Sequence, residues 1–307
     1  MLNENLNKDT GFGDSASGMG GRMINKDGTF NVDRKGISFL TRISSYQSML
    51  TMSRWKFVLV IILFYFLINL GFTFLYWLIG VEHFQGIESQ NPVQQFFELY
   101  FFSTQTYTTV GYGRINPTGQ MANWLASIES LVGFLSFALA TGLLYGRFSR
   151  PKSFIYFSDK LLHCDFKNGK ALMFRMVGFK DDHILTNVEV KVGIRLSVFD
   201  EQKNRSFQFY NLELERHHVD SLVLNWTVVH PINEESPLYN MNPQQIVDFQ
   251  PEISATIIGF DEVYSSNVVA RVSYAREDLI FGKKFKSMYF SKGNTTELDI
   301  GLLNDVD

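Results

Sequence analysis

The sequence predicts a membrane α domain followed by an all-β domain, and three patterns lead to this prediction. Two apolar runs, residues 55–80 and 120–148, are each long enough to cross a bilayer as a helix. Between them, a short apolar segment ends in a glycine-rich hexapeptide. After residue 150, apolar and polar residues alternate in short stretches, as in half-buried strands. We therefore expect two spanning helices with a re-entrant loop between them, followed by an immunoglobulin-like β-sandwich.

The average composition hides this division. The chain has 307 residues and a net charge of −3, which taken alone would suit a soluble protein. The first apolar run, from Trp55 to Gly80, carries Lys56 as its only charge, and as a helix it would be about 39 Å long. The second run carries only Glu129 and Arg147. Since a hydrocarbon core is about 30 Å thick, both runs are predicted to span it.

The distribution of charge predicts the orientation of these spans. Basic residues gather before the first run and after the second, whereas the loop between the runs is mostly acidic. Because short cytoplasmic segments carry an excess of Lys and Arg, both termini are expected in the cytoplasm. The sequence thus predicts a multi-pass protein of the cell (inner) membrane.

The segment before the first run divides into two parts. Residues 1–35 are rich in Gly, Asn, Ser and Asp, and we expect them to be disordered. Residues 36–53 place apolar side chains at near-helical spacing, which predicts an amphipathic helix lying along the membrane surface. These apolar positions are Ile37, Leu40, Ile43, Tyr46 and Leu50.

The loop between the spans is predicted to contain a short helix at residues 92–106. Asn91 is a favourable N-cap, and Pro92 suits the first helical turn. The residues that follow are too apolar for an exposed loop, so the helix is expected to dip into the membrane. Its negative C-terminal end would then point toward a central cavity, which favours a cation.

The hexapeptide at residues 108–113, TTVGYG, follows this helix directly. Gly111 and Gly113 can adopt left-handed dihedrals without steric cost. With this alternation, the carbonyls of Thr109, Val110, Gly111 and Tyr112 could all point one way, and the Thr109 hydroxyl would add a further oxygen. Four chains around an axis would then form stacked oxygen cages able to replace the water around a potassium ion. A strand followed by a glycine-rich turn is the ordinary alternative. TVGYG is also the known filter motif of potassium channels.

Residues 151–292 are predicted to form the β-sandwich, with residues 293–307 as a C-terminal tail. The clearest strand covers residues 188–198, where apolar and polar positions alternate, and residues 222–228 show the same period. Shorter candidates are residues 171–177, 206–210, 255–260 and 268–274. A short helix is expected to begin at Asn242-Pro243.

Over residues 35–292 the chain resembles the inward-rectifier potassium channels of bacteria, the KirBac family. The resemblance is carried by the filter and by further motifs at specific positions: Arg54-Trp55, Phe148-Ser149-Arg150-Pro151, Asn168-Gly169-Lys170, Phe174-Arg175, His183, His230-Pro231-Ile232, Ser236-Pro237-Leu238-Tyr239, Asp261-Glu262, Ala270-Arg271 and Ser273-Tyr274. It implies a homotetrameric, potassium-selective channel with K⁺ bound at Thr109–Tyr112, no other cofactor, no enzymatic activity and no nucleic-acid partner.

The resemblance also implies roles for single residues. Thr108 would support the filter formed by Thr109, Val110, Gly111, Tyr112 and Gly113. Glu129 is expected near the cavity beneath the filter, with a buried structural hydrogen bond to the pore helix as the alternative, and Gly133 matches the inner-helix hinge glycine. Phe137 stands where strong rectifiers carry Asp or Asn, so it is expected to act as an apolar gate rather than to bind polyamines. Further constrictions are implied at Tyr145 and at residues 263–267.

A basic ring at the inner leaflet is the last implied site. Its charges would suit anionic lipid headgroups, although they could also serve only to set the topology. The expected members are Arg54, Lys56, Arg147, Arg150 and Lys152.

A different class of function remains open on the residues alone. The chain could be a membrane-anchored β-sandwich that binds a partner without transporting anything. That protein would be monomeric in detergent, and Gly111 and Gly113 would have no role in it.

Overall fold

The computed structural model describes residues 22–33, 35–36, 38, 45–199 and 205–307. The chain divides into a helical unit, Lys35–Arg150, and a β unit formed by Pro151–Asp307 together with the N-terminal segment up to Arg34. We describe each unit separately.

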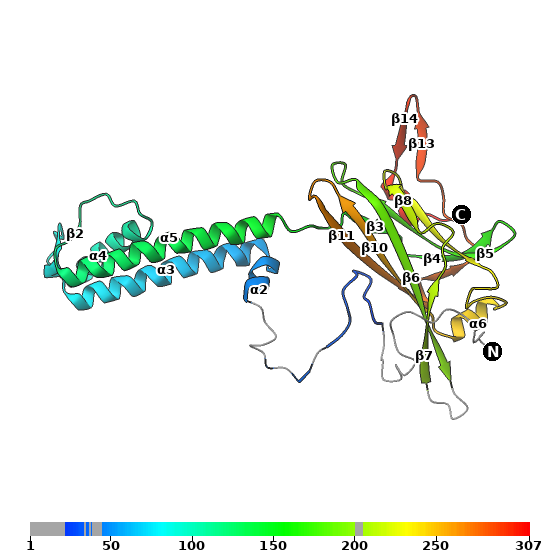
Figure 1. The fold of residues 1–307 in the computed structure, drawn as a ribbon, viewed down its shortest axis with the longest axis horizontal. Coiled ribbons are helices and arrows are strands. Elements are labelled where there is room, and N and C mark those ends of the chain that lie inside the picture. The colour runs from blue at the N-terminus through cyan, green and yellow to red at the C-terminus, as the bar shows by residue number, and fades with distance from the viewer. Residues whose placement is uncertain (1–21, 34, 37, 39–44, 200–204) are drawn as a thin grey trace. The chain divides into compact units, whose positions relative to one another are not determined.

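Over its described residues, the helical unit consists of three long helices and a short one (Figure 1). Its elements are α2 (Ser45–Thr51), α3 (Arg54–Ile79), the 3-10 turn η1 (Val81–His83), β1 (Phe84–Gln85), α4 (Pro92–Tyr107), β2 (Asn116–Pro117) and α5 (Gln120–Phe148). Helices α3 and α5 are long and apolar enough to cross a membrane, and most of their side chains are exposed in the single chain. Of the predicted surface helix at 36–53, the described part is α2, and residues 37 and 39–44 lie outside the described residues.

A compact apolar cluster holds α3, α4 and α5 together. Tyr76, Phe84 and Phe102 form mutual edge-to-face ring contacts with centroids 5.3–5.5 Å apart. Leu99 and Ala122 are fully buried beside them. Large side chains meet at this point because each helix turns one apolar stripe toward the other two.

The β unit is a sandwich of two sheets of five strands each, within the part of the chain that the structure describes (Figure 1). One sheet has the order β11-β10-β6-β7, with β8 also pairing with β6; the other has the order β12-β4-β5-β3, with β9 pairing with β5. The strands are β3 (Ile155–Phe157), β4 (Leu161–Phe166), β5 (Gly169–Gly178), β6 (Leu185–Phe199), β7 (Arg205–Leu212), β8 (His218–Ser221), β9 (Trp226–Ile232), β10 (Glu252–Asp261), β11 (Ser266–Ala275) and β12 (Leu279–Phe281).

The inward-facing residues of both sheets form one apolar core. Along β6, every second residue from Val188 to Leu196 is buried, as the alternating pattern predicts. The predicted strands at 171–177, 206–210, 255–260 and 268–274 lie within β5, β7, β10 and β11. The predicted strand at 222–228 is only partly correct, because residues 226–228 lie in β9 whereas Leu222–Asn225 form the connection between β8 and β9. The expected helix at Asn242-Pro243 is α6 (Pro243–Asp248).

The expectation that residues 1–35 are disordered is wrong for residues 22–33. These residues form a tight hairpin against β11, with Ile24 paired to Phe30 and Gly28 in its turn at φ 79°. The main-chain N–H of Met23 donates to Glu252 at 2.8 Å, and the Ser273 hydroxyl donates to the carbonyl of Ile24. Arg22 and Lys26 both form ion pairs with Asp278. This polar segment is ordered because the β unit supplies ion-pair partners for its charged side chains and hydrogen-bond partners for its main chain.

The predicted tail, 293–307, also has regular structure. Strand β13 (Tyr289–Lys292) pairs with β14 (Thr295–Leu298), and the turn η3 (Ile300–Asn304) follows. Leu303 packs against Val177 and Met288. The folded domain therefore extends beyond the boundary at residue 292 that the sequence suggested.

Candidate functional site

Helix α4 leads directly into the hexapeptide. Its N-cap is Asn91, whose side chain accepts a hydrogen bond from the N–H of Val93 at 2.9 Å, and Pro92 occupies the first turn. The helix ends at Tyr107 with Thr108 as its C-cap, one residue later than predicted. The N–H groups of Val110 and Gly111 turn back to the carbonyl of Gln105, at 2.9 and 3.3 Å.

The backbone of the hexapeptide alternates in handedness. Thr109, Gly111 and Gly113 have positive φ values of 59°, 52° and 82°, whereas Val110 and Tyr112 between them do not. In an ordinary strand, successive carbonyl groups point in opposite directions. The alternating sign of φ in the hexapeptide instead lets successive carbonyl groups point to the same side. The sequence predicted the left-handed dihedrals of the two glycines but not that of Thr109. A threonine in this conformation is uncommon and is typically found at functional sites.

An ion pair links α4 to the far end of the hexapeptide. The guanidinium of Arg114 lies 3.1 Å from the carboxylate of Glu98, which is on α4. The other oxygen of Glu98 accepts the main-chain N–H of Glu88 at 3.2 Å. In addition, the side-chain amide of Asn116 donates to the carbonyl of Gly113 at 2.8 Å. Through Glu98, the segment before α4 and the segment after the hexapeptide are both held to the same helix. The pair was not predicted, although Glu98 and Arg114 are the two charges nearest the motif in the sequence.

Glu129 does not face the cavity as expected. Its side chain is fully buried behind α4, where it accepts hydrogen bonds from the hydroxyls of Tyr76 and Ser103, both at 2.5 Å. The alternative, a buried hydrogen bond to the pore helix, describes this side chain, because helical spacing places Glu129 one turn before Gly133 but does not say which neighbour that face contacts. Gly133 itself lies directly against the carbonyl of Tyr107, so any side chain there would overlap with it. Whether Gly133 also acts as a hinge stays a prediction.

An apolar groove of about 730 Å³ runs along the helical unit. Thr108 and Thr109 line it beside Gly133, Phe134 and Phe137, and Met49 of α2 borders it. Phe137 is 75% exposed in the single chain, and Tyr145, two turns further along α5, is 74% exposed. Large apolar side chains with this exposure need lipid or another protein surface to cover them.

The five basic residues of the expected lipid site differ in their surroundings. Arg147 is held within the helical unit, where it donates to the carbonyls of Met49 and Met52 at 3.2 and 2.5 Å and lies over the ring of Phe57. It thereby links α5 to the C-terminus of α2. The other four are exposed, and one of them, Lys152, belongs to the β unit: Arg54, Lys56, Arg150 and Lys152.

The segment 263–267 includes the turn between β10 and β11. Asp261, which is fully buried, accepts the N–H groups of Val263 and Tyr264 at 2.9 and 3.0 Å. Its second oxygen lies 2.7 Å from Nδ1 of His183. Val263 at the tip of the turn is exposed. The turn is therefore fixed at its base and open at its tip.

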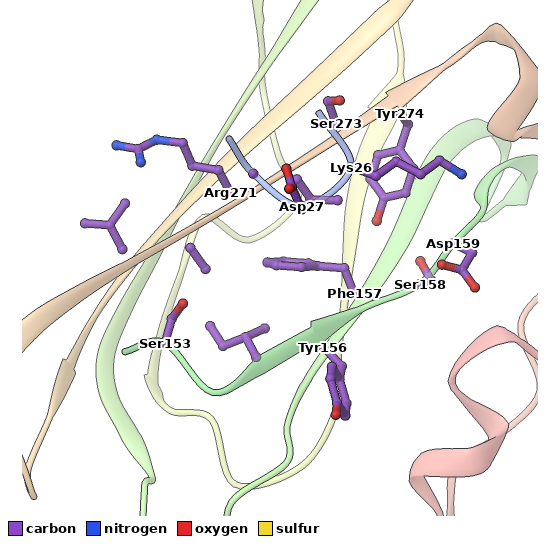
Figure 2. Close-up of a pocket in the computed structure, with 15 residues that line it drawn as sticks. Lys26, Asp27, Ser153, Tyr156, Phe157, Ser158, Asp159, Arg271, Ser273 and Tyr274 are labelled. Carbon is purple, nitrogen blue, oxygen red and sulfur yellow. The ribbon is translucent and has the colours of Figure 1, made fainter. Parts of the chain in front are cut away.

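A second pocket, of about 380 Å³, lies in the β unit (Figure 2). It opens between β3 and β11, the edge strands of the two sheets, and the N-terminal hairpin closes one side. Phe157 lies between β3 and the turn at Lys26 and Asp27, with Ser153 and Arg271 at the rim. None of the residues predicted for the filter, the gate or the lipid site lines this pocket.

The sequence comparisons identify both units. Residues 155–306 match the family model described as the inward rectifier potassium channel C-terminal domain, and residues 56–150 match the ion channel family model. The chain is 30% identical over 287 residues to the inward rectifier potassium channel Kirbac3.1 of Paramagnetospirillum magnetotacticum, covering 93% of this chain and 95% of the relative. The chain belongs to the inward rectifier potassium channel family.

Vertebrate inward rectifiers are similar over a smaller part of their length. The chain is 25% identical over 272 residues to ATP-sensitive inward rectifier potassium channel 12 of Gallus gallus, and 25% identical over 271 residues to the protein of that name from Mus musculus. In both cases the match covers 80% of this chain and 62% of the relative. The predicted fold class, two spanning helices followed by a β-sandwich, is thus confirmed, and the relatives are ion channels rather than enzymes.

Proposed function

We propose that this inward rectifier forms a homotetrameric pore that conducts K⁺ through the oxygens of Thr109, Val110, Gly111 and Tyr112. The observation that carries the proposal is the alternating backbone of the hexapeptide, in which every second residue has positive φ. The exposure of the filter in the single chain supports assembly, because backbone at membrane depth must be buried in protein or line water. Four copies around an axis would satisfy this requirement.

The gate that we propose has two levels. Phe137 and Tyr145 would narrow the pore along α5, and residues 263–267 would form a constriction in the β unit. The exposure of both aromatic side chains and the open tip at Val263 support this assignment. Since Phe137 offers no charge to a polyamine or to magnesium, rectification by such blockers is expected to be weak.

Regulation by anionic lipids is the third part of the proposal. With both termini in the cytoplasm, Arg54, Lys56, Arg150 and Lys152 would face headgroups of the inner leaflet. Each exposed charge near an anionic surface is worth about 1 kcal/mol. Arg147 has carbonyl partners within the chain, so we assign it a smaller part in lipid binding than the sequence suggested.

Uptake of rubidium into proteoliposomes loaded with potassium tests the proposal. We expect uptake that external barium blocks and that excess sodium does not reduce. The variant Gly111→Ala should abolish uptake while the tetramer still forms, because φ 52° is unfavourable for a residue with a Cβ. Unchanged uptake in this variant, or a monomeric protein in detergent, would contradict the proposed pore. A lipid series with and without anionic headgroups then tests the regulatory part.

A further inference from the structure

Glu129 joins three helices through one carboxylate. Its Oε2 accepts the hydroxyl of Tyr76 on α3, and its Oε1 accepts the hydroxyl of Ser103 on α4, each at 2.5 Å. Glu129 itself is on α5, and all three side chains are buried. A carboxylate buried in an apolar layer is costly unless it is hydrogen-bonded, so the two donors on separate helices constrain where those helices lie.

The hydroxyl of Ser103 also reaches α3 directly. It lies 3.2 Å from both the main-chain carbonyl and the side-chain oxygen of Asn69, and the hydroxyl of Thr73 donates to that carbonyl at 2.7 Å. Asn69, Thr73 and Tyr76 follow one another at helical spacing, so they share the face of α3 that meets α4. Polar groups between apolar helices bind one another because no water is available to them.

A second contact lies one helical turn away. Gly133 follows Glu129 by four residues on α5, and Tyr107 follows Ser103 by four residues on α4. The close approach of Gly133 to the carbonyl of Tyr107 leaves no room for a Cβ. Helix α5 therefore contacts α4 at two successive turns, and the second contact comes immediately before Thr108. Together they fix both the rotation and the depth of the helix that leads into the filter.

We propose that Glu129 is a positioning residue for ion selectivity. By accepting hydrogen bonds from Ser103 and Tyr76, Glu129 fixes the position of α4. The C-terminal end of α4 in turn sets where residues 109–112 begin, and thus the spacing of their oxygens around the ion. Selectivity depends on the size of such a site and on the number of oxygens in it. Glu129 does not touch the ion itself. The inference rests on the proposed function, because it assigns a cause to the selectivity of that pore.

The test compares channels that lack one member of the network with a matched control. The variants are Glu129→Ala, Ser103→Ala and Tyr76→Phe. The control is Ser127→Ala, since Ser127 lies on the same helix, is exposed, and donates only to the carbonyl of Asn123 in its own helix at 2.9 Å. The first readout is the permeability ratio of K⁺ over Na⁺ from reversal potentials in planar bilayers. The second is the rise in melting temperature of the detergent-solubilised tetramer when K⁺ replaces Na⁺.

We expect Glu129→Ala to lower the permeability ratio roughly tenfold, the equivalent of one charge-assisted hydrogen bond. Ser103→Ala and Tyr76→Phe should each lower it less, and Ser127→Ala should leave it unchanged. Glu129→Gln should restore most of the ratio, because hydroxyls can donate to the amide oxygen or accept from the amide nitrogen. A Glu129→Ala tetramer that melts earlier but keeps the wild-type ratio would overturn the proposal.

The second readout separates this inference from the proposed conduction. If the wild-type protein does not conduct but K⁺ still raises its melting temperature, conduction fails and the positioning role is decided by that rise. The rise should then be lost in Glu129→Ala and kept in Ser127→Ala. If Glu129→Ala keeps it, the inference is wrong. A wild-type protein with neither conduction nor K⁺-specific stabilisation overturns both, since no potassium filter would exist to be positioned.

Discussion

Both units bury a glutamate, and they satisfy its carboxylate in different ways. In the helical unit, Glu129 accepts two hydrogen bonds from neutral hydroxyls. In the β unit, Glu252 lies 2.6 Å from the guanidinium of Arg195, which is directly opposite on the neighbouring strand. Glu252 also accepts the N–H of Met23. The helical unit thus satisfies its buried glutamate with neutral donors, whereas the β unit satisfies it with a buried cation.

The largest expected effect distinguishes the two glutamates by the same substitution. Glu252→Gln should lower the free energy of unfolding of the β unit by about 3–5 kcal/mol, because it removes the carboxylate charge that lies against the buried guanidinium of Arg195. Glu129→Gln should cost only about 1 kcal/mol, because its hydroxyl partners can rotate to suit an amide. Pulse proteolysis of the full chain in a urea series measures both. Equal losses of unfolding free energy in the two variants would contradict the proposed difference between a charged partner and neutral partners.

Acid should weaken the β unit through a buried histidine. His230 contacts the carbonyl of Glu213 at 2.6 Å and the hydroxyl of Ser236 at 2.8 Å. Burial lowers the pKa of His230, and the Glu213 carbonyl opposes that shift in part. Because the unfolded chain binds the proton more tightly, stability should begin to fall as pH drops below about 6.5, by at most about 1.4 kcal/mol per pH unit.

The control for the acid effect is His230→Gln, which should flatten this dependence in urea titrations between pH 7 and pH 5. Some slope should remain, because burial, together with the nearby charge of Lys170, also lowers the pKa of His163. A variant as sensitive to acid as the wild type would exclude His230 as the responsible group.

Two helices that begin with the same dipeptide offer a smaller contrast. Asn242 caps α6 in a reciprocal arrangement with Gln245, and Asn91 caps α4 through the N–H of Val93. Replacing either asparagine with alanine should cost about 1 kcal/mol. We expect Asn242→Ala to lower the urea midpoint of the β unit and Asn91→Ala to leave that midpoint unchanged. A shift of the β unit by both variants would show that the units unfold together.

The smallest effect is expected at the hairpin of β13 and β14. Lys292 and Glu297 form an ion pair at 3.0 Å, but both side chains are more than half exposed. An exposed pair of this kind contributes about 0.2–1 kcal/mol, so Lys292→Ala should fall near the low end of that range. A loss as large as that of Glu252→Gln would mean that burial does not decide the strength of these pairs.

The sequence predicted what depends on local pattern. The lengths of the two apolar runs predicted the ends of α3 and α5 to within one residue. The Asn-Pro dipeptides predicted where α4 and α6 begin. A hydrogen bond from Glu129 to the pore helix was one of two alternatives, but its partners Ser103 and Tyr76 could not be named because they depend on how three helices rotate about their axes. The N-terminal hairpin escaped prediction because its composition is typical of disorder, while its order comes from Glu252, Ser273 and Asp278, more than 200 residues away in the chain.

The N-terminal hairpin has a mechanical consequence. Residues 22–33 are fastened to the β unit, and the chain then runs through residues 34–44 to α2 before it reaches the spanning helices. The chain returns to the β unit at Pro151, directly after α5. The β unit is thus tethered to the helical unit at two ends, by α2 and by α5. A load on the β unit is therefore carried through two covalent connections, one that leads to α2 and one that leads to α5, and Arg147 joins these two helices.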